Sequence, residues 1–379
     1  MNTNSQPDER HADPASPEAM RIVVFSDAYG YRNGVGAYYC DLLEHLRPRI
    51  GSVEVVCPGV TPEGKQQGLS FPLPGDPSQR LSLPGIRKAW RTVRRVRPHV
   101  IVAASPGPYG MLGAALAKRF RTRFCFGYHT QYDMLTGLYW NRLFGGIAKR
   151  YLAWLDRRFF KRSDAVFTNG RHMVAIAESM GARRIQLIGT PVDKRLLGDP
   201  VPIQRDAFGP VVFVGRLALE KNVDKVIDAA RELPDIPFAV AGDGPLVEVV
   251  RQAEADIPNL DYVGWLDRET LLTMLDERCE ILVLPSQVES FGTVAAEAMA
   301  RERLVLVSDR CGIADWPELT PGLEVTPLNE PLAPKLAQLA QMTPETRAAK
   351  RRRARECCVR FVQKTVNDWK NTLYDVACQ

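Results

Sequence analysis

The sequence lacks the segments that insert a protein into a membrane or export it. No apolar run approaches the roughly 18 residues that a spanning helix needs. Residues 1–20 are polar, acidic and proline-containing, without the basic and then apolar order of a secretory signal. We therefore expect a cytoplasmic chain that begins with a disordered tail at residues 1–20.

Motifs for disulfide formation, metal binding and dinucleotide binding are missing as well. The eight cysteines show no C-x-x-C spacing, and the chain contains no D-x-D. We expect reduced, packed thiols, with neither a metal site nor a cofactor. The spacing G-x-G-x-x-G is absent after the first strand-like segment, which argues against a dinucleotide site there.

Charge is unevenly distributed along the 379 residues. Residues 1–190 carry 27 Lys and Arg against 14 Asp and Glu, whereas residues 191–379 carry 23 against 30. A basic half suits anionic lipid, a phosphorylated acceptor or nucleic acid, although solvated helix faces are the alternative for each basic cluster. Nucleic acid is the least favoured partner, because aromatic and basic residues interleave there at helical spacing. The basic clusters are residues 87–97, 118–123 and 157–162.

Short apolar runs alternate with helix-like segments along the whole chain. This alternation predicts an α/β fold with two doubly wound parallel sheets, and the length suits two domains. Residues 190–210 hold four prolines, two glycines and no helical period. We therefore expect domains at residues 21–190 and 211–379, joined by a linker at residues 191–210.

The stretch LPSQVESFGTVAAEAMA places Glu289 and Glu297 on either side of a change from strand to helix. If the helix begins near Gly292, its free N–H groups and positive dipole end face Glu289, and such an end holds phosphate or an oxygen-rich ligand. The two carboxylates can accept hydrogen bonds from sugar or ribose hydroxyls. A surface glutamate before an ordinary amphipathic helix is the alternative for this motif alone.

Further loops of the second half follow its other apolar runs. Arg216 and Lys221 stand between a strand and a helix, where a guanidinium fork and a point charge suit a diphosphate. Two loop cations in salt bridges are the alternative. The turns at Gly242 and Gly244 and at Trp265 leave backbone open to a nucleobase, or are plain turns.

Two residues of the first half lie at similar junctions. Gly34, in the sequence NGVG, stands between the first strand and a helix, where a ligand can approach the backbone closely. His129 follows another strand, and open α/β sheets bind ligands at the carboxyl ends of their strands. It can bond a substrate hydroxyl or stabilise charge, and a buried structural histidine is an equal alternative.

The ordered series VGRLALEKN, AGDGP, VGW and ESFGTVAAEAMA resembles the donor domain of the retaining, nucleotide-sugar-dependent glycosyltransferases of the GT-B fold. This group includes phosphatidylinositol mannosyltransferases, bacterial glycolipid glucosyltransferases and sucrose synthase. The resemblance covers nearly everything from residue 21 onward. It implies two Rossmann-like domains facing a central cleft, with the acceptor bound by residues 21–190 and the nucleotide sugar by residues 211–379.

The resemblance also implies roles for single residues. Arg216 and Lys221 would hold the donor diphosphate and offset charge on the leaving group. Glu289 would bond hydroxyls of the transferred sugar, Glu297 would bond the ribose, and His129 would contact the sugar near the reacting carbon. The other donor-binding residues would be Gly34, Gly242, Gly244, Trp265, Ser290, Phe291, Gly292 and Thr293.

The implied reaction moves a sugar from a UDP- or GDP-linked donor to an acceptor hydroxyl with retention at the anomeric carbon. No carboxylate is an obvious nucleophile, so front-face attack within an ion pair is preferred. The basic first half favours a lipid or lipid-linked glycan acceptor at the inner face of the cell membrane. A nucleotide-sugar epimerase and a non-catalytic protein of the same fold are the alternatives.

Overall fold

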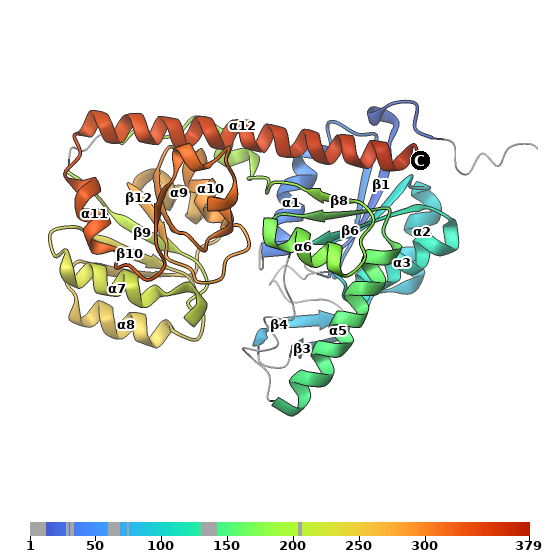
Figure 1. Cartoon of the computed structure of the whole chain (residues 1–379), viewed down its shortest axis with the longest axis horizontal. Coiled ribbons are helices and arrows are strands. Elements are labelled where there is room, and N and C mark those ends of the chain that lie inside the picture. The colour runs from blue at the N-terminus through green and yellow to red at the C-terminus, as the bar shows by residue number, and fades with distance from the viewer. Residues whose placement is uncertain are drawn as a thin grey trace, which may run out of the picture. The chain divides into compact units, whose positions relative to one another are not determined.

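The computed structural model describes residues 13–27, 30, 34–59, 69–73, 76–129, 142–203 and 207–379. The chain divides into two compact units, each of which holds a six-stranded parallel sheet (Figure 1). The first unit comprises residues 1–188 and 365–379, and the second comprises residues 189–364. Two doubly wound α/β domains are therefore confirmed as the fold class.

The strands of the first unit are, in chain order, β1 (Arg21–Phe25), β2 (Ser52–Val56), β3 (Ser70–Leu73), β4 (Asp76–Ser82), β5 (Val100–Ala103), β6 (Arg123–Tyr128), β7 (Ala165–Thr168) and β8 (Ile185–Leu187). The sheet order is β2-β1-β5-β6-β7-β8, and β3 pairs with β4 in a separate antiparallel hairpin. The sequence pattern did not predict this hairpin, because Pro72 and Pro77 interrupt its strands and proline is rare within strands.

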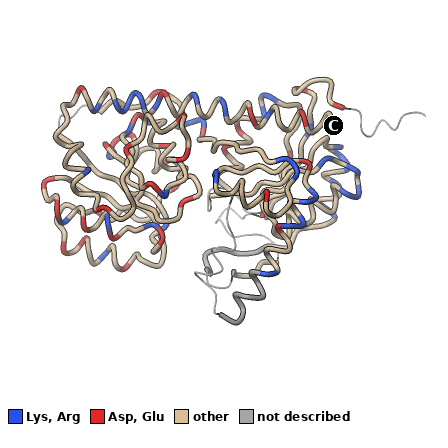
Figure 2. Tube along the Cα trace, in the orientation of Figure 1, with Lys and Arg blue, Asp and Glu red and all other residues tan. Residues whose placement is uncertain are grey.

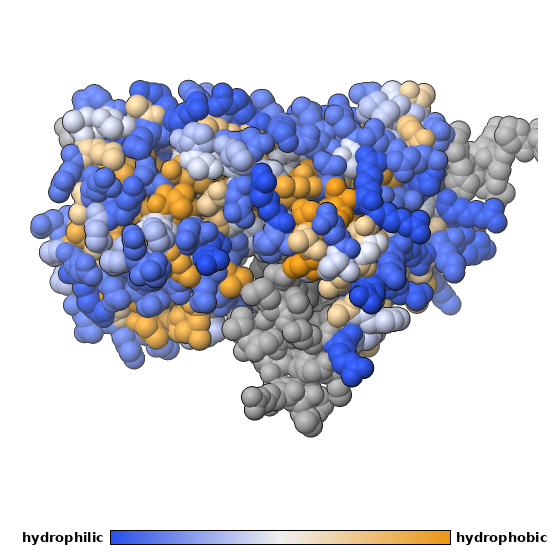
Figure 3. All heavy atoms as spheres, in the orientation of Figure 1, coloured by the Kyte–Doolittle hydropathy of each residue, from blue (hydrophilic) through white to orange (hydrophobic). Residues whose placement is uncertain are grey.

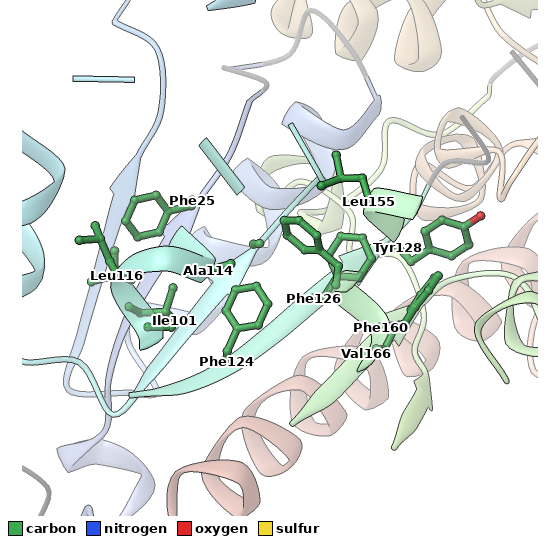
Figure 4. Close-up of a cluster of buried hydrophobic side chains, with 14 of the residues drawn as sticks. Phe25, Ile101, Ala114, Leu116, Phe124, Phe126, Tyr128, Leu155, Phe160 and Val166 are labelled. Atoms are coloured by element: carbon green, nitrogen blue, oxygen red, sulfur yellow. The ribbon is translucent and has the colours of Figure 1, made fainter. Parts of the chain in front are cut away.

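One face of this sheet packs against four of the described helices. Aromatic side chains fill the layer between them, with Phe25 on β1, Phe126 on β6 and Phe160 on the helix that follows (Figure 4). This continuous apolar core fixes the sheet whose carboxyl ends carry the candidate residues. The four helices are α2 (Ile86–Val96), α3 (Pro108–Phe120), α5 (Arg142–Arg162) and α6 (Arg171–Ser179).

The opposite face is covered by α1 (Gly34–Leu46) and by the last turns of α12 (Pro344–Ala377). Successive strand residues point to opposite faces, so Phe167 faces away from the core that contains Val166. Trp369 of α12 packs on Phe167 with ring centroids 3.8 Å apart, and its indole N–H donates to the hydroxyl of Tyr38 at 2.7 Å. The predicted second domain included residues 365–379, whereas these contacts group them with the first unit.

The strands of the second unit are β9 (Val211–Val214), β10 (Phe238–Ala241), β11 (Leu260–Gly264), β12 (Ile281–Leu284), β13 (Leu304–Ser308) and β14 (Glu324–Thr326). Their order in the sheet is β11-β10-β9-β12-β13-β14, and all neighbours run parallel. The chain moves outward in one direction from β9 to β11 and in the other from β12 to β14. The point between β9 and β12 is therefore the topological switch point, outside which doubly wound sheets bind ligands.

The helices of the second unit follow its strands in the expected alternation. They are α7 (Val223–Glu232), α8 (Val247–Asp256), α9 (Arg268–Glu277), α10 (Thr293–Ala300), α11 (Ala333–Ala340) and the first part of α12. Short 3-10 turns occur at η4 (Lys194–Leu197), η5 (Leu219–Lys221), η6 (Gly312–Asp315) and η7 (Thr320–Gly322).

The expected linker, residues 191–210, is tied to the second unit. Val192 and Leu196 are buried. The guanidinium of Arg301, itself held by Asp276 at 2.7 Å and 2.8 Å, donates to the carbonyl oxygens of Gly198 at 3.0 Å and Asp199 at 2.8 Å. Buried side chains and charge-assisted hydrogen bonds thus hold much of this segment in place.

A disordered tail was expected at residues 1–20. Residues 1–12 lie outside the described residues, but the segment from Pro17 to Met20 is ordered. Pro17–Ala19 form the 3-10 turn η2, and Met20 is completely buried. Gly51 allows this, because a Cβ at Gly51 would lie 2.5 Å from the carbonyl oxygen of Glu18. The amide of Ser52 donates to Met20 at 3.1 Å, which continues the parallel pairing of β1 and β2.

Charged side chains cover much of the described surface. On the face drawn in Figure 3 most of the described residues are hydrophilic. Lys and Arg follow one another closely along α2 of the first unit (Figure 2). That helix buries only Ala89 and Val93, so its basic residues point outward.

Candidate active site

The switch point of the second unit brings together two of the predicted catalytic residues. Lys221 ends the turn η5 after β9, and Glu289 lies in the loop after β12. The Lys221 Nζ lies 2.6 Å from Glu289 Oε2 and 3.3 Å from the carbonyl oxygen of Val288. The two loops thus meet through a charge-assisted hydrogen bond at the carboxyl ends of neighbouring strands.

Backbone contacts fix this pairing. The amide of Gln287 donates to the carbonyl oxygen of Glu220 at 2.8 Å, and the side-chain amide of Asn222 donates to that of Pro285 at 2.8 Å. Asn222 has a left-handed conformation, with φ of 49°, which ends η5 and starts α7. Asparagine tolerates this region better than most residues, so the local sequence suits the turn.

The electrostatics of Lys221 follow from this geometry. Burial lowers the pKa of its ammonium group, but the charge and hydrogen bond of Glu289 outweigh burial and raise the pKa above its ordinary value. Lys221 is therefore a fixed cation at neutral pH. Its side chain is 17% exposed and that of Glu289 is 24% exposed, so the pair is accessible to a ligand.

Arg216 lies in the same loop, directly after β9. Its guanidinium is 4.0 Å from the carboxylate of Glu220. Two cations at a strand end can bind a diphosphate, as the sequence predicted, and both have a carboxylate neighbour in the structure. Arg216 and Lys221 lie five residues apart in the same segment after β9.

The glycines Gly242 and Gly244 hold the loop that carries Arg216. A Cβ at Gly242 would lie 1.8 Å from the carbonyl oxygen of Gly215, and one at Gly244 would lie 2.5 Å from that of Leu217. Their φ angles are 143° and 153°, which disfavour side chains. Their close approach is therefore to backbone of the neighbouring strand's loop, a role that the sequence did not reveal.

The predicted junction of loop and helix at Gly292 is confirmed. Helix α10 begins at Thr293, and Gly292 has a φ of 92°. A Cβ at Gly292 would lie 2.9 Å from Cys311 Sγ, so only glycine fits. Phe291 is buried and its ring stacks on that of Phe361 at 5.8 Å, so its side chain faces the core and only its backbone can meet a ligand. Ser290 and Thr293, on either side of Phe291 and Gly292, are half-buried.

Glu297 lies inside the second unit rather than at its surface. Its side chain is 3% exposed and forms an ion pair through Oε1 with Nη1 of Arg268, the first residue of α9. The Nε of Arg268 is also 4.0 Å from the Oδ2 of buried Asp193. Local sequence patterns could not identify Arg268 as the partner of Glu297, because the two residues lie 29 positions apart.

Trp265 stands at the carboxyl end of β11 and is 64% exposed. It follows Gly264, whose φ of 81° turns the chain at the end of the strand. No atom lies within 4 Å of a Cβ placed on Gly264. An exposed indole at a strand end can stack on a flat ring.

In the first unit, His129 follows β6 and lies among aromatic side chains. Its Nε2 is 3.2 Å from the hydroxyl of Tyr39, and its ring is 4.3 Å from that of Tyr38. Burial lowers the pKa of His129 to about 3, although a hydrogen bond with Asn169 acts in the opposite direction. Histidine is therefore neutral here at ordinary pH and acts as a hydrogen-bonding group. A Cβ at Gly127 would lie 2.1 Å from the Tyr39 hydroxyl, so this arrangement requires glycine.

Gly34 is the first residue of α1 and is exposed. A Cβ placed on it meets no atom within 4 Å, so nothing in the fold itself demands glycine. Its neighbour Asn33 lies outside the described residues. Gly34 and His129 belong to the first unit, and the other predicted site residues belong to the second.

Asp27 is a further polar residue at the switch point of the first unit, between β1 and β5. Its carboxylate accepts hydrogen bonds from the Ser105 hydroxyl and the Tyr109 amide, both at 2.8 Å. Burial raises the pKa of Asp27, and these hydrogen bonds counteract the rise only in part. Asp27 thereby caps the start of α3. Its position two residues after β1 was visible in the sequence, but its partners were not.

Two properties of the described residues concern metals and membranes. No group of three or more His, Cys, Asp and Glu side chains among them is placed to hold a metal ion. Within the same residues, no helix combines the length and apolar composition that a membrane crossing requires.

Sequence comparisons match both units to glycosyltransferases. Residues 32–196 match the family described as Glycosyltransferase Family 4, and residues 208–354 match the family described as Glycosyl transferases group 1. The sulfoquinovosyl transferase SQD2 of Arabidopsis thaliana is 26% identical over 329 residues, which cover 80% of this chain. The match spans 62% of the length of that relative.

Solved structures share the fold. Sucrose-phosphate synthase of Thermosynechococcus elongatus superposes with a TM-score of 0.68 at 18% identity and covers 94% of this chain and 98% of its own. HepE of Anabaena, solved with UDP and glucose, gives a TM-score of 0.65 at 17% identity over 93% of this chain and 99% of its own. Two doubly wound units and family matches over both of them establish that this chain belongs to the glycosyltransferases of the GT-B fold.

Proposed function

We propose that the protein transfers a sugar from a nucleoside diphosphate sugar to an acceptor hydroxyl. The observation that carries this proposal is the Lys221–Glu289 pair at the switch point of the second unit, beside the start of α10. A cation, a carboxylate and free helix N–H groups at one place supply what a sugar diphosphate needs. Family membership of the chain agrees with this reaction class.

Each of these groups has a distinct task in the proposed reaction. Lys221 and Arg216 bind the diphosphate and stabilise the negative charge that grows as the sugar departs. The carboxylate oxygen of Glu289 that does not contact Lys221 accepts a hydrogen bond from a sugar hydroxyl. The backbone amides at the start of α10 stabilise the same charge, and Trp265 stacks on the nucleobase.

Transfer proceeds with retention at the anomeric carbon in this proposal. Glu289 is paired with Lys221, and it is therefore better suited to orient the sugar than to attack it. Departure and attack on the same face, within an ion pair held by the two cations, need no protein nucleophile. His129, neutral through burial, would donate or accept a hydrogen bond near the reacting carbon.

The donor is proposed to be a hexose linked to UDP or GDP. The structure of HepE with UDP and glucose supports UDP as the first nucleotide to examine. The residues proposed for the diphosphate and sugar serve either nucleotide, so the base is read elsewhere in the unit.

The acceptor is proposed to be a lipid or lipid-linked glycan reached at an anionic membrane surface. Helices α2 and α5 both cover one face of the first sheet, so their outer sides point the same way. On α2, Ile86 is 65% exposed and the guanidinium of Arg94 lies 5.1 Å over the ring of Trp90. On α5, Trp154 is 55% exposed, with Arg158 at 5.7 Å. Exposed tryptophan beside arginine is typical of the membrane interface.

Release of nucleoside diphosphate from a panel of UDP- and GDP-sugars tests the reaction. The assay is run with and without vesicles that contain anionic lipid and diacylglycerol, for wild type, Lys221→Ala and Glu289→Ala. Vesicle-dependent release from one donor, lost in both variants, is the expected result. Release stimulated only by soluble glycans would retain the transferase and reject the lipid acceptor. A sugar isomer formed without acceptor would indicate an epimerase, and no reaction with any donor would reject the proposal.

A further inference from the structure

The second unit contains a cluster of four charges around Glu297 that the reaction proposed above does not use, and all of it except the half-exposed Arg195 is buried or nearly so. It joins Asp193 at the start of η4, Arg195, Arg268 at the start of α9 and Glu297 on α10. The side chains of Asp193 and Glu297 are 1% and 3% exposed. Two carboxylates and two guanidinium groups make the cluster neutral overall, which is what burial of charge requires.

We infer that Arg268 is a positioning residue that orients the Glu297 carboxylate to accept a ribose hydroxyl of the donor nucleotide. This inference rests on the proposed function. The ion pair uses Nη1 of Arg268 and Oε1 of Glu297. Because a planar guanidinium restricts the direction of the carboxylate it binds, this contact leaves Oε2 of Glu297 to accept the hydrogen bond from the ribose hydroxyl.

Arg268 is itself held in place from two sides. Asp267 caps α9 by accepting hydrogen bonds from the amide and the hydroxyl of Thr270, at 2.8 Å and 2.7 Å. This cap fixes the backbone at Arg268, the first helical residue. On the other side, Asp193 lies 4.0 Å from the Arg268 Nε, so the guanidinium is drawn to two carboxylates at once.

Asp193 is an anion at neutral pH in this cluster. Burial raises its pKa, but hydrogen bonds from Arg195 and the charges of Arg195 and Arg268 outweigh burial and leave the pKa below its ordinary value. The amide of Arg195 donates to Asp193 at 2.9 Å, and its Nη2 lies 2.6 Å away. The charge of Asp193 therefore attracts Arg268 at neutral pH, in addition to the attraction of Glu297.

A carboxylate that accepts from a ribose hydroxyl makes a nucleotide site prefer ribose over deoxyribose. Loss of a hydrogen bond to a charged group weakens binding by roughly tenfold or more. If Arg268 sets the direction of Glu297, removing its guanidinium should reduce this preference even though no atom of Arg268 need touch the nucleotide. A purely structural ion pair would instead lower the affinity for all nucleotides equally.

The experiment measures binding of UDP and GDP and of their 2′-deoxy and 3′-deoxy forms by calorimetry, using the full chain. Wild type is compared with Arg268→Ala, Arg268→Lys and Glu297→Gln. The matched control is Arg278→Ala, since Arg278 forms an exposed pair with Asp261 at 2.5 Å at the other end of α9. Wild type and control should bind one ribonucleotide about tenfold more tightly than one of its deoxy forms. The ratio of these two affinities should approach one in Arg268→Ala and Glu297→Gln.

Each other outcome has a clear meaning. An unchanged ratio in Arg268→Ala, with weaker binding of both forms, would make the ion pair structural and overturn the inference. Equal binding of ribo and deoxy forms by wild type would overturn it while leaving the proposed function intact. No nucleotide binding by wild type would reject both. If Arg268→Ala does not fold, Arg268→Lys decides, because a point charge should restore folding and leave a reduced ratio.

Discussion

Lys221 Nζ and Glu289 Oε2 are 2.6 Å apart and link the loops after β9 and β12 in the second unit. Neither side chain is fully exposed, so each depends on the other for compensation of its charge. Substitutions in this pair should therefore change both the stability of the protein and its activity.

Replacing Lys221 by methionine should affect both. The partly buried Glu289 would lose its partner, at a cost of about 1–3 kcal/mol in the free energy of unfolding. Turnover should fall by roughly 100-fold or more, because a cation at the departing diphosphate is lost. Denaturant titration and diphosphate release measure the two effects.

A double mutant separates these contributions. Lys221→Met combined with Glu289→Gln should regain part of the lost stability but none of the activity. Arg231→Met is the control, since its pair with Asp228 on α7 is exposed on both sides. Simple additivity of the two single substitutions would contradict a coupled pair.

The pH dependence of the Lys221 contribution has a definite sign. The pKa of Lys221 in the folded state lies above its unfolded value, because Glu289 outweighs the effect of burial. Its contribution to stability is therefore complete below the unfolded pKa of roughly 10.4 and is lost as pH rises through the folded pKa.

Gly242→Ala should disturb the loop that carries Arg216. The added Cβ would meet the Gly215 carbonyl oxygen at 1.8 Å, and the φ of 143° is strained for alanine. We expect a loss of about 2–4 kcal/mol in the free energy of unfolding. Gly264→Ala is the matched control, because its φ of 81° adds strain but its surroundings are open, so a loss of only about 1 kcal/mol is expected. Equal losses in the two variants would show that contact with Gly215 is unimportant.

Much of this arrangement could be predicted from the sequence, and the reasons are local. Buried parallel strands are continuous apolar runs, and the change from loop to helix at Gly292 is encoded in adjacent residues. The side-chain partners could not be predicted. The indole N–H of Trp369 donates to the hydroxyl of Tyr38, which lies 331 positions away in the sequence. The close approach of Gly242 to the carbonyl oxygen of Gly215 is likewise visible only in the folded structure. Contacts between distant segments depend on sheet order, which local patterns do not specify.

Acid should destabilise the first unit through His129. The pKa of His129 is lowered to about 3 by burial, although Asn169 opposes this, whereas in the unfolded chain it is roughly 6.5. The unfolded state binds more protons between these values, so stability falls as pH decreases from about 6.5 toward 3. The slope contributed by this residue is at most about 1.4 kcal/mol per pH unit.

Urea titration between pH 4.5 and 7.5 measures that slope. His129→Gln should flatten it, whereas His172→Gln, on the exposed side of α6, should leave it as in wild type. Equal slopes for wild type and His129→Gln would contradict a buried, neutral histidine. Activity should show no inflection from His129 itself near pH 6.5.

The proposed membrane surface of the first unit predicts a selective effect of two arginines on α2. Arg87 and Arg91 flank exposed Ile86 and Trp90. Each arginine near an anionic surface contributes roughly 1 kcal/mol, so the double change to glutamine should weaken binding to anionic vesicles about 30-fold. Sedimentation with vesicles of increasing phosphatidylserine content measures this.

The control for that prediction removes the same charge elsewhere. Arg352 and Arg353 are exposed on α12 within the second unit, and their double change to glutamine should leave vesicle binding nearly unchanged. If both double variants weaken binding equally, net charge rather than the α2 surface attracts the membrane. Because an apolar contact by Ile86 and Trp90 resists salt while charge attraction is screened, part of the wild-type binding should persist at high ionic strength. Complete loss of binding in salt would leave the two apolar side chains without a role at the membrane.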